Sequence, residues 1–477
     1  MTDLTRRRFM AGLATAASLP LYGSAGCGRL LNVILCMSDD QGWGDVGYNG
    51  HPVLRTPNLD AMAEEGVRFD RFYAAGPWCA PTRGSCLTGR NACRYGFDFA
   101  NEGQLPLEER TLAEVLRELG YATGHFGKWH LGALSRSDDG SSVHHQDYSP
   151  PWLHGFDICF TTQANVPTWN PSRDPLTREP IETRYWLGPG RRPLASGLHG
   201  DDSRIIMDRA LEFMRDAIHR SQAFLAVIWF HAPHSPVVAG APYRRLYGEH
   251  TAEEQHYFGV LTAMDEQIGR LRQALHDLGV AANTMLWFCS DNGPARGHAD
   301  LPEELNSRAR GSAGGLRSKK ASLYEGGIRV PGLLLWPAGV PQPTRIKAPC
   351  VTSDYYPTIL AALGHTPQSQ PRPLDGINIL GMLRTAGARR PSPIYFRSGD
   401  QLAVVTNRYK LFSRNGGKRF QLYDLNQDAA EENDLADHHP RNVARLATGL
   451  NRWLQSVAAS DRGADYGSRA AARTRVA

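Results

Sequence analysis

The sequence predicts an α/β fold: a large mixed, mostly parallel sheet flanked by helices, with a smaller C-terminal α+β subdomain. Three observations predict it. Four mainly apolar runs, at residues 30–37, 121–126, 224–230 and 285–290, lack the polar alternation of a sheet with one wet face. Segments with helical periodicity separate these runs. After residue 393 the pattern changes to short strands joined by turns.

The first 26 residues predict an export signal. Thr5 to Met10 is similar to a twin-arginine motif, and a short, weakly apolar segment extends from Met10 to Leu21. We therefore expect the twin-arginine export machinery to carry the folded chain, giving a periplasmic or secreted bacterial protein. Cys27 follows a poor lipobox that lacks the usual leucine and lies close to the first strand, so we do not expect a lipid anchor there.

The first strand ends in two adjacent carboxylates, Asp39 and Asp40. Like charges placed this way repel unless a positive group compensates them. The pair therefore indicates either a helix cap or a site for a hard cation, and the sequence leaves both open. A helix is then expected over residues 56–69, with Gly66 near its end.

Cys79 opens the run CAPTRGSCLTGR, to which that helix leads. Pro81 suits the first turn of a helix, so we expect Cys79 at a helix start and Arg83 one turn later. Free backbone N–H groups and a guanidinium together form an anion site, where a cysteine is a reactive thiolate or something made from one. The alternative is a buried helix-start cysteine beside a surface arginine.

A helix over residues 112–119 precedes the second strand, which leads to Lys128 and His130. If that segment stays extended, both side chains leave it on one side. Residues 133–200 show little periodicity and predict a long insertion that shapes a binding mouth. Its aromatic residues either pack the loop onto the body or stack on a sugar or aryl ligand: Trp152, Trp169, Trp186, His144 and His145.

The third and fourth strands each follow a predicted helix, over residues 205–219 and 253–278. All four strands place polar residues at their carboxyl ends, the edge at which open α/β sheets bind ligands. Independent caps would not be expected to fall at the same edge four times, so we predict a single site. Its members are Asp39, Asp40, Lys128, His130, His231, His234, Asp291 and Asn292.

The C-terminal part begins after a composition break at residues 367–393. Short strands at 394–396, 402–405, 409–412 and 421–425, and a helix over 442–457, predict an antiparallel α+β subdomain. The expected organisation is a signal peptide at 1–26, a catalytic domain at 27–385, the subdomain at 386–457 and a disordered tail at 458–477.

Charge and cysteine usage exclude several classes of protein. The 53 Lys and Arg against 48 Asp and Glu give a net charge of +5, too mild and dispersed for nucleic acid or a membrane surface. The eight cysteines form no C-x-x-C pair, which argues against a zinc knot, and Cys36 and Cys289 lie in apolar runs as core thiols. After the signal, no stretch reaches the roughly 18 apolar residues of a membrane span.

Taken together, these motifs resemble the type I sulfatases of the alkaline phosphatase superfamily, in family order from Asn32 to about Trp453. The resemblance rests on the Asp39-Asp40 pair, the TPNLD run at 56–60, the Cys79 run, GKWH at 127–130, Pro233-His234, Asp291-Asn292-Gly293, Lys320 and EGG at 325–327. One departure is SKKA at 318–321 where the family commonly has GGKG. Spacing to Glu325 selects Lys320, with Lys319 as a competitor.

The resemblance implies an enzyme that hydrolyses a sulfate ester, and a nucleophile made by oxidising Cys79 to formylglycine (3-oxoalanine). It also implies one calcium ion at Asp39, Asp40, Asp291, Asn292 and position 79. The oxygen donors alone suit calcium or magnesium better than zinc.

Roles for the remaining residues follow from the same resemblance. Arg83 orients the nucleophile, Lys128 and Lys320 hold the sulfate, and His234 is the acid for the leaving alcohol. His130 is the base that releases sulfate, while His231 either contacts substrate or supports the site. The implied partners are a sulfated small molecule or glycan and a formylglycine-generating enzyme. Between substrates we expect a carbohydrate sulfate, because of the long insertion with its tryptophans and histidines.

Two other functions remain open. A phosphonate monoester or phosphodiester hydrolase shares the fold and the nucleophile, but those enzymes tend to show Asp-His where this chain has Asp291-Asn292. A non-catalytic binding relative would leave Cys79 unoxidised, although the intact set of ligand residues argues against it.

Overall fold

The structure is a computed structural model that describes residues 31–136, 145–193, 197–297, 306–366, 373–385 and 387–466. The predicted signal, Cys27 and His144 lie outside these ranges, as do residues 467–477. Within them, the largest sheet has nine strands in the order β11-β2-β10-β8-β1-β7-β4-β5-β6. No helix in the described ranges combines the length and the apolar character needed to cross a bilayer.

The predicted strands form the centre of this sheet, where β8, β1, β7, β4 and β5 run parallel. Antiparallel pairing of β10 with β8 and of β6 with β5 makes the sheet mixed. The fold class predicted from sequence is therefore confirmed. The strands are β1 (Asn32–Ser38), β2 (Val67–Phe69), β4 (Ala122–Lys128), β5 (Ile158–Thr162), β6 (Tyr185–Trp186), β7 (Phe224–Trp229), β8 (Thr284–Ser290), β10 (Gly332–Leu335) and β11 (Thr344–Ile346).

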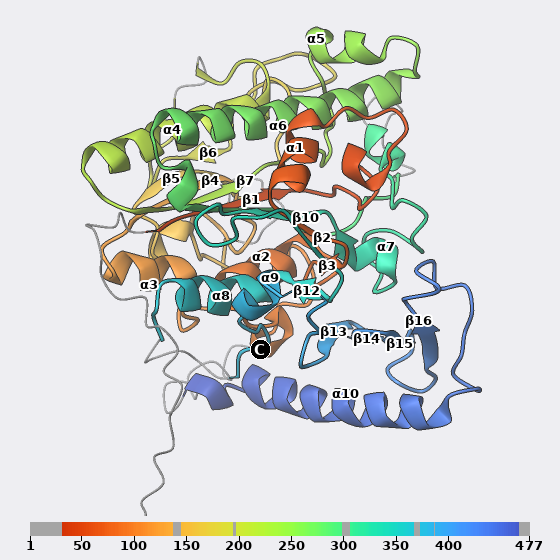
Figure 1. Cartoon of the computed structure of the whole chain (residues 1–477). Coiled ribbons are helices and arrows are strands. Elements are labelled where there is room, and N and C mark those ends of the chain that lie inside the picture. The colour runs from red at the N-terminus through yellow and green to blue at the C-terminus, as the bar shows by residue number, and fades with distance from the viewer. Residues whose placement is uncertain are drawn as a thin grey trace, which may run out of the picture.

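Helices cover both faces of the sheet, as Figure 1 shows. One face carries α1 (Pro57–Glu65), α4 (Asp202–His219) and α6 (Ala252–Asp277), and the other carries α2 (Cys79–Thr88), α3 (Leu112–Glu118), α8 (Tyr355–Ala362) and α9 (Leu380–Leu383). Strand β1 supplies both cores: Val33 and Leu35 join one apolar cluster, and Ile34 and Cys36 join the other. Apolar residues at every position are what a strand buried on both faces requires.

Two expectations about the flanking segments were wrong. The helix predicted over 56–69 ends at Glu65, and residues 67–69 form β2 between β10 and β11. Gly66 ends the helix, and the strand pairing on both sides outweighs any remaining helical preference. The insertion at 133–200 is also less irregular than expected, because it contributes β5 and β6 to the large sheet.

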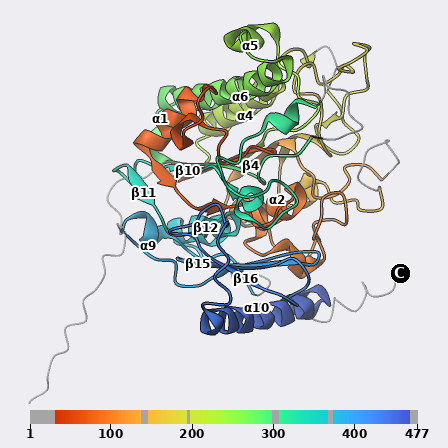
Figure 2. The same cartoon turned by 90° about the vertical axis from the view of Figure 1, so that its right-hand side faces the viewer.

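A second, four-stranded sheet forms the predicted C-terminal subdomain, at the bottom of Figures 1 and 2. It is antiparallel throughout and consists of β13 (Ile394–Ser398), β14 (Gln401–Val405), β15 (Tyr409–Ser413) and β16 (Gln421–Asp424). Helix α10 (Pro440–Asp461) packs on it through Leu446, Leu450 and Val457. The helix passes residue 457, so residues 458–461 of the predicted tail are helical, contrary to expectation.

Short elements complete the chain between these parts. A three-stranded sheet has the order β12-β3-β9 and is formed by β3 (Phe72–Tyr73), β9 (Arg329–Val330) and β12 (Cys350–Val351). Two further short helices are α5 (Ala241–Arg244) and α7 (Glu325–Ile328).

A buried group of charges joins the small sheet to the body. Lys410 of β15 places its Nζ 3.0 Å from Glu325 Oε1 and 2.9 Å from Glu431 Oε1. All three side chains are fully buried, and Glu325 also accepts a hydrogen bond from the Tyr73 hydroxyl at 2.9 Å. We call Glu325, Lys410 and Glu431 the junction cluster. Because α7 begins at Glu325, this cluster fixes α7 against the small sheet.

Candidate active site

The carboxyl ends of four adjacent strands, β8, β1, β7 and β4, meet at one edge of the sheet. Asp39 and Asp40 follow β1, and Asp291 and Asn292 follow β8. Lys128 is the last residue of β4, and the His231–His234 turn follows β7. The site residues predicted at the ends of four separate strands therefore lie at the same edge of the sheet.

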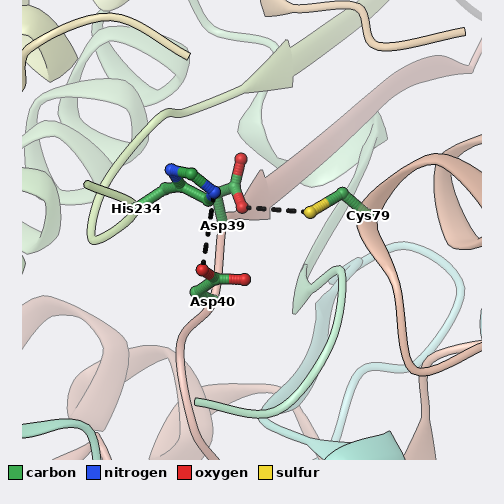
Figure 3. Close-up of side chains that lie close together, drawn as sticks. All are labelled: Asp39, Asp40, Cys79 and His234. Carbon is green, nitrogen blue, oxygen red and sulfur yellow. Dashed lines mark hydrogen bonds and ion pairs between the residues drawn. The ribbon is translucent and has the colours of Figure 1, made fainter. Parts of the chain in front are cut away.

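Cys79 is the first residue of α2, and its side chain points at this edge (Figure 3). Trp78 precedes it in an extended conformation, Pro81 lies in the first turn, and Gly89 ends the helix in the left-handed conformation with φ of 71°. Cys79 is 1% exposed, and every residue of α2 is buried. The helix therefore presents the thiol from a fixed position inside the protein.

Three carboxylates and three cations surround the thiol, and we call these six residues the edge cluster: Asp39, Asp40, Asp291, Arg83, Lys128 and Lys320. The Arg83 guanidinium lies 2.7 Å from Asp291 Oδ2 and 3.2 Å from Asp39 Oδ2. Lys128 Nζ lies 2.5 Å from Asp39 Oδ2, and Lys320 Nζ lies 2.5 Å from Asp40 Oδ1. The formal charges of this set sum to zero.

Lys320, and not Lys319, reaches the thiol. Lys320 Nζ lies 3.2 Å from Cys79 Sγ, whereas Lys319 Nζ donates to the carbonyl oxygens of Ala309 and Gly311. The glycines of the EGG run explain the placement, because a Cβ on Gly327 would lie 2.0 Å from the carbonyl oxygen of Ser322. Only glycine allows α7 to pack so closely on the segment that carries Lys320.

Of the three carboxylates, Asp291 is the least well compensated by positive charge. Burial and the nearby Asp39 raise the pKa of Asp291 to about 6, even though Arg83 is in contact with it. Burial acts in the same direction on Asp39 and Asp40, but neighbouring cations, Lys128 for Asp39 and Lys320 for Asp40, hold both pKa values below the ordinary range. An added divalent cation would relieve the repulsion within this group.

Several donor atoms at the edge are suited to a metal ion. Asp39, Asp40, Cys79 and His234 each offer a ligand atom, and these atoms lie within 4.8 Å of one another (Figure 3). Asp40 Oδ2 and Asn292 Oδ1 are buried and accept no hydrogen bond from the described residues. Buried oxygens of this kind are expected to have a partner. The oxygen-rich set fits a hard cation such as calcium or magnesium.

The Cys79 thiol is not an activated thiolate. Burial and the negative charges of Asp291 and Asp39 raise its pKa far above the ordinary value, although Lys128 and Lys320 oppose them. Of the possibilities that the sequence left open, a reactive thiolate is therefore disfavoured, and a cysteine beside a surface arginine does not fit the fully buried Arg83. An unmodified cysteine at this position would be a poor nucleophile.

His234 has a defined orientation at the rim of the edge cluster. Its Nδ1 donates to the carbonyl oxygen of Ser235 at 2.7 Å, which leaves Nε2 facing Asp40 Oδ2 at 3.7 Å. Burial lowers the His234 pKa to about 4, against the opposing effect of Asp39. The sequence could not indicate the role of Ser235, because a backbone oxygen carries no residue signature.

The contacts of His231 agree with only one of its two predicted roles, which were substrate contact and support of the site. It is fully buried, with Nδ1 2.7 Å from Asp202 Oδ2 and Nε2 2.7 Å from Thr162 Oγ1. Both ring nitrogens therefore already have protein partners. This geometry disfavours substrate contact and favours support of the turn that carries His234.

His130 is buried beside the edge cluster, but not by way of an extended segment. Its backbone is left-handed with φ of 56°, which turns it away from the alternation of β4. His130 Nε2 lies 2.6 Å from Asn101 Oδ1. Asn101 was missed by the sequence interpretation, since it belongs to a polar loop without any motif.

The tryptophans of the insertion serve mainly as packing groups. Trp186 is buried in the core and Trp152 packs against it, while the Trp169 ring lies directly over Gly240. The described His145 is exposed. These positions give little support to stacking on a sugar, which was the basis for expecting a carbohydrate substrate.

Comparisons with known proteins agree with the fold and the motifs. The sulfatase family model matches residues 31–365. N-acetylgalactosamine-6-sulfatase from Homo sapiens is 33% identical over 409 residues, which cover 80% of this chain and 71% of that protein. The crystal structure of Ps i-CgsB aligns with a TM-score of 0.76 at 25% identity, covering 90% of this chain and 93% of that chain.

A phosphonate hydrolase shares the architecture. The phosphonate monoester hydrolase of Agrobacterium radiobacter aligns with a TM-score of 0.63, covering 90% of this chain and 96% of that chain. At 18% identity this match concerns the fold alone. The family match, the identity to the human enzyme and the fold together lead to one conclusion: this chain belongs to the sulfatase family and is a sulfuric ester hydrolase.

Proposed function

We propose that this protein hydrolyses a sulfate ester of a carbohydrate, using formylglycine formed from Cys79 and one bound calcium ion. The observation that carries the proposal is the placement of Cys79 Sγ, 3.5 Å from Asp39 Oδ1 and 3.2 Å from Lys320 Nζ. An unreactive thiol at the centre of so many charges is better understood as the precursor of a nucleophile than as the nucleophile.

The proposed calcium ligands are Asp39, Asp40, Asp291, Asn292 and an oxygen at position 79 in place of the sulfur. Bound calcium would add two positive charges to a cluster whose formal charges cancel, and it would polarise a sulfate oxygen. The hydrate of formylglycine would supply a hydroxyl group as nucleophile. His234 Nε2, near Asp40, borders the same space.

The cations of the edge cluster have distinct roles in the proposal. Lys128 and Lys320, each in contact with a carboxylate of the calcium site, would hold the sulfate oxygens and stabilise the charge that develops on them. Arg83 is bound to Asp39 and Asp291, so it would fix the ligands and orient the group at position 79.

His234 and His130 would transfer protons in two different steps of the reaction. His234 would donate the Nε2 proton to the leaving alcohol, and because its Nδ1 proton is given to Ser235, the donating ring is doubly protonated. Burial opposes that state, and the carboxylates of Asp39 and Asp40 favour it. His130 would accept a proton from the group at position 79, so that sulfate is released. His231 would hold the His234 turn in place.

The carbohydrate substrate is supported by relatives and not by the tryptophans. The human relative is an N-acetylgalactosamine-6-sulfatase. We therefore propose a 6-O-sulfated amino sugar or a similar sulfated glycan as substrate.

Export and maturation complete the proposal. The twin-arginine motif at Thr5 to Met10 supports periplasmic or secreted localisation, without a lipid anchor at Cys27. A formylglycine-generating enzyme is required as a partner, because the buried, protonated Cys79 cannot supply the hydroxyl nucleophile itself.

A turnover panel on calcium-loaded protein tests the proposal, after peptide mass spectrometry has measured conversion of Cys79. The substrates are 6-O-sulfated N-acetylgalactosamine, an aryl sulfate and an aryl phosphonate monoester. We expect the sulfated sugar to be hydrolysed fastest and the phosphonate slowest. Full activity with unmodified Cys79 would refute the nucleophile. Preference for the phosphonate would assign the protein to the second candidate, which Asn292 already disfavours.

A further inference from the structure

The contact between Asn101 and His130 joins a surface loop to a buried histidine. Asn101 is exposed, whereas His130 is 5% exposed, and the 2.6 Å distance joins Asn101 Oδ1 to His130 Nε2. An amide oxygen accepts hydrogen bonds but cannot donate them. The Nε2 atom must therefore carry the proton in this arrangement, and Nδ1 of the neutral ring is left as the acceptor.

The second ring nitrogen of His130 is left without a partner. His130 Nδ1 is buried and has no hydrogen-bond partner in the described ranges of the chain. Burial lowers the pKa of His130 well below the ordinary value, and the charges of Lys128 and Arg83 act in the same direction. These cations belong to the edge cluster, so the ring lies within its electrostatic reach and stays neutral. An unprotonated ring nitrogen without a partner is able to accept a proton.

Both backbones are held in an uncommon conformation to make this contact. Asn101 has φ of 65° and His130 has φ of 56°, both in the left-handed region. Asparagine tolerates this region better than most residues, but two facing residues in it indicate a position that the surrounding structure imposes. The contact is therefore specified by the fold on both sides.

The loop that carries Asn101 is anchored at two points. Asp98 accepts a hydrogen bond from Arg397 of β13 at 2.9 Å, and Phe99 packs edge-on against Trp78, the residue before Cys79. Trp78 in turn donates to Ser398 Oγ at 3.2 Å. The small C-terminal sheet thus braces both the start of α2 and the loop of Asn101.

We propose that Asn101 is a positioning residue that keeps His130 in the tautomer protonated on Nε2, so that Nδ1 is the atom that accepts the proton during sulfate release. The inference deepens the proposed function and rests on it for the role of His130. The tautomer itself is a property of the folded chain and does not depend on turnover.

The first test measures that tautomer without any catalysis. The full chain, labelled with ¹⁵N in its histidines, is compared by NMR with Asn101→Asp and Asn101→Leu, and His130→Gln identifies the His130 signals. We expect the Nε2-protonated signature in the unchanged protein and in Asn101→Asp, because a carboxylate also accepts and cannot donate. Asn101→Leu should lose this signature. A proton on Nδ1 in the unchanged protein would overturn the inference.

The second test asks whether the contact matters for the reaction. In protein with Cys79 converted, Asn101→Leu should lower kcat by about tenfold or more at nearly constant KM, because a positioned base contributes about 10²–10⁴-fold. Asn101→Asp should restore most of the rate, and Glu102→Ala, at the exposed next residue, should leave it unchanged. Equal rates for the Leu variant and the unchanged protein would overturn the positioning role.

These measurements separate two kinds of failure. If converted, calcium-loaded protein hydrolyses no sulfate ester, the proposed function fails, whatever the NMR signature. If it does hydrolyse sulfate esters but His130→Gln is fully active, the base assignment fails. If only the Asn101 variants behave like the unchanged protein, then Asn101 is a loop residue and the further inference alone is wrong.

Discussion

The edge cluster and the junction cluster are both buried groups of opposite charges, yet they are built differently. In the junction cluster, Lys410 sits between Glu325 and Glu431. Each cluster contains one carboxyl group with a raised pKa, Glu431 in the junction cluster and Asp291 in the edge cluster. Glu431 Oε1 lies 2.9 Å from Lys410 Nζ, whereas Asp40 Oδ2 and the neighbouring Asn292 Oδ1 have no hydrogen-bond partner among the described residues. In the junction cluster the opposite charges pair with one another, whereas the edge cluster leaves oxygen atoms available to a further cation.

Buried charges can therefore either hold two parts of a chain together or form a binding site. A closed cluster holds two parts of the chain in one relation, and breaking it is costly because a charge is left unpaired. An open cluster keeps carboxylates close together at the expense of stability and gains a site for a cation and an anion. The predictions below should separate the two clusters, beginning with the largest expected effect.

Replacement of Cys79 should abolish catalysis without unfolding the protein. Because the nucleophile is lost, Cys79→Ala should lower kcat/KM for a sulfate ester by on the order of 10⁴-fold or more. Cys86→Ala, in the same buried helix, serves as the control and should change stability alone. Sulfate release measured for both variants decides the matter, and more than a hundredth of normal activity in Cys79→Ala would contradict the assignment.

Removal of the metal should affect only the edge cluster. Calcium at a hundredfold excess over its Kd should stabilise the protein by about 2.7 kcal/mol, and chelation should remove this together with activity. In Asp291→Ala, calcium should produce no shift of Tm, while Lys410→Met should keep the full shift. Calorimetry with and without calcium tests this. A calcium shift retained by Asp291→Ala would show that the ion binds elsewhere.

Breaking the junction cluster should cost stability. Lys410→Met removes the only cation in contact with Glu431 among the described residues and leaves Glu325 with Arg329 at 3.6 Å, and the free energy of unfolding should fall by about 3–5 kcal/mol. The exposed Lys418→Met is the matched control and should change it little. Urea unfolding provides the measurement, and an unchanged midpoint for Lys410→Met would mean that the cluster does not hold the small sheet.

The smallest expected effect is a pH dependence of stability from Glu431. Burial raises the pKa of Glu431 from its ordinary value of 4.5 to about 7. Between these values the folded protein binds the proton more tightly than the unfolded chain, so stability falls as the pH rises from about 4.5 to about 7. Glu431→Gln should flatten this slope in unfolding curves, whereas Glu432→Gln, an exposed neighbour, should preserve it. The same slope in both variants would exclude Glu431 as its origin.

Structure could be predicted from the sequence wherever a residue type or a short run restricts the local backbone. Buried parallel strands appear as mainly apolar runs, and because their carboxyl ends share one edge of the sheet, Asp39, Lys128 and Asp291 were predicted to lie together. Pro81 and Gly89 mark the two ends of α2. The spacing to Glu325 in the sulfatase resemblance selected Lys320 but left Lys319 as a competitor, and only the contact of Lys320 Nζ with Cys79 Sγ at 3.2 Å separates the two.

Other features arise from contacts between distant segments, and no local pattern encodes them. Val67 and Phe69 suit a strand, but three residues are too few to be recognised as one, and only the pairing with β10 and β11 on either side fixes β2. His231 and His234 are each followed, two residues later, by a proline, so the sequence does not distinguish them. Their surroundings differ because Asp202 and Thr162 bind the ring of His231. Asn101 likewise becomes significant only when a distant loop meets His130.

If Cys79 is converted to formylglycine as proposed, its burial limits when the conversion can take place. An enzyme that oxidises this residue must take the thiol into its own active site, but here the thiol is 1% exposed within a helix that is buried throughout. We infer that oxidation precedes folding and that folding then closes the opportunity for good. Under that proposal, a molecule that folds before oxidation would stay inactive, and the active fraction of a preparation would reflect the relative rates of oxidation and folding.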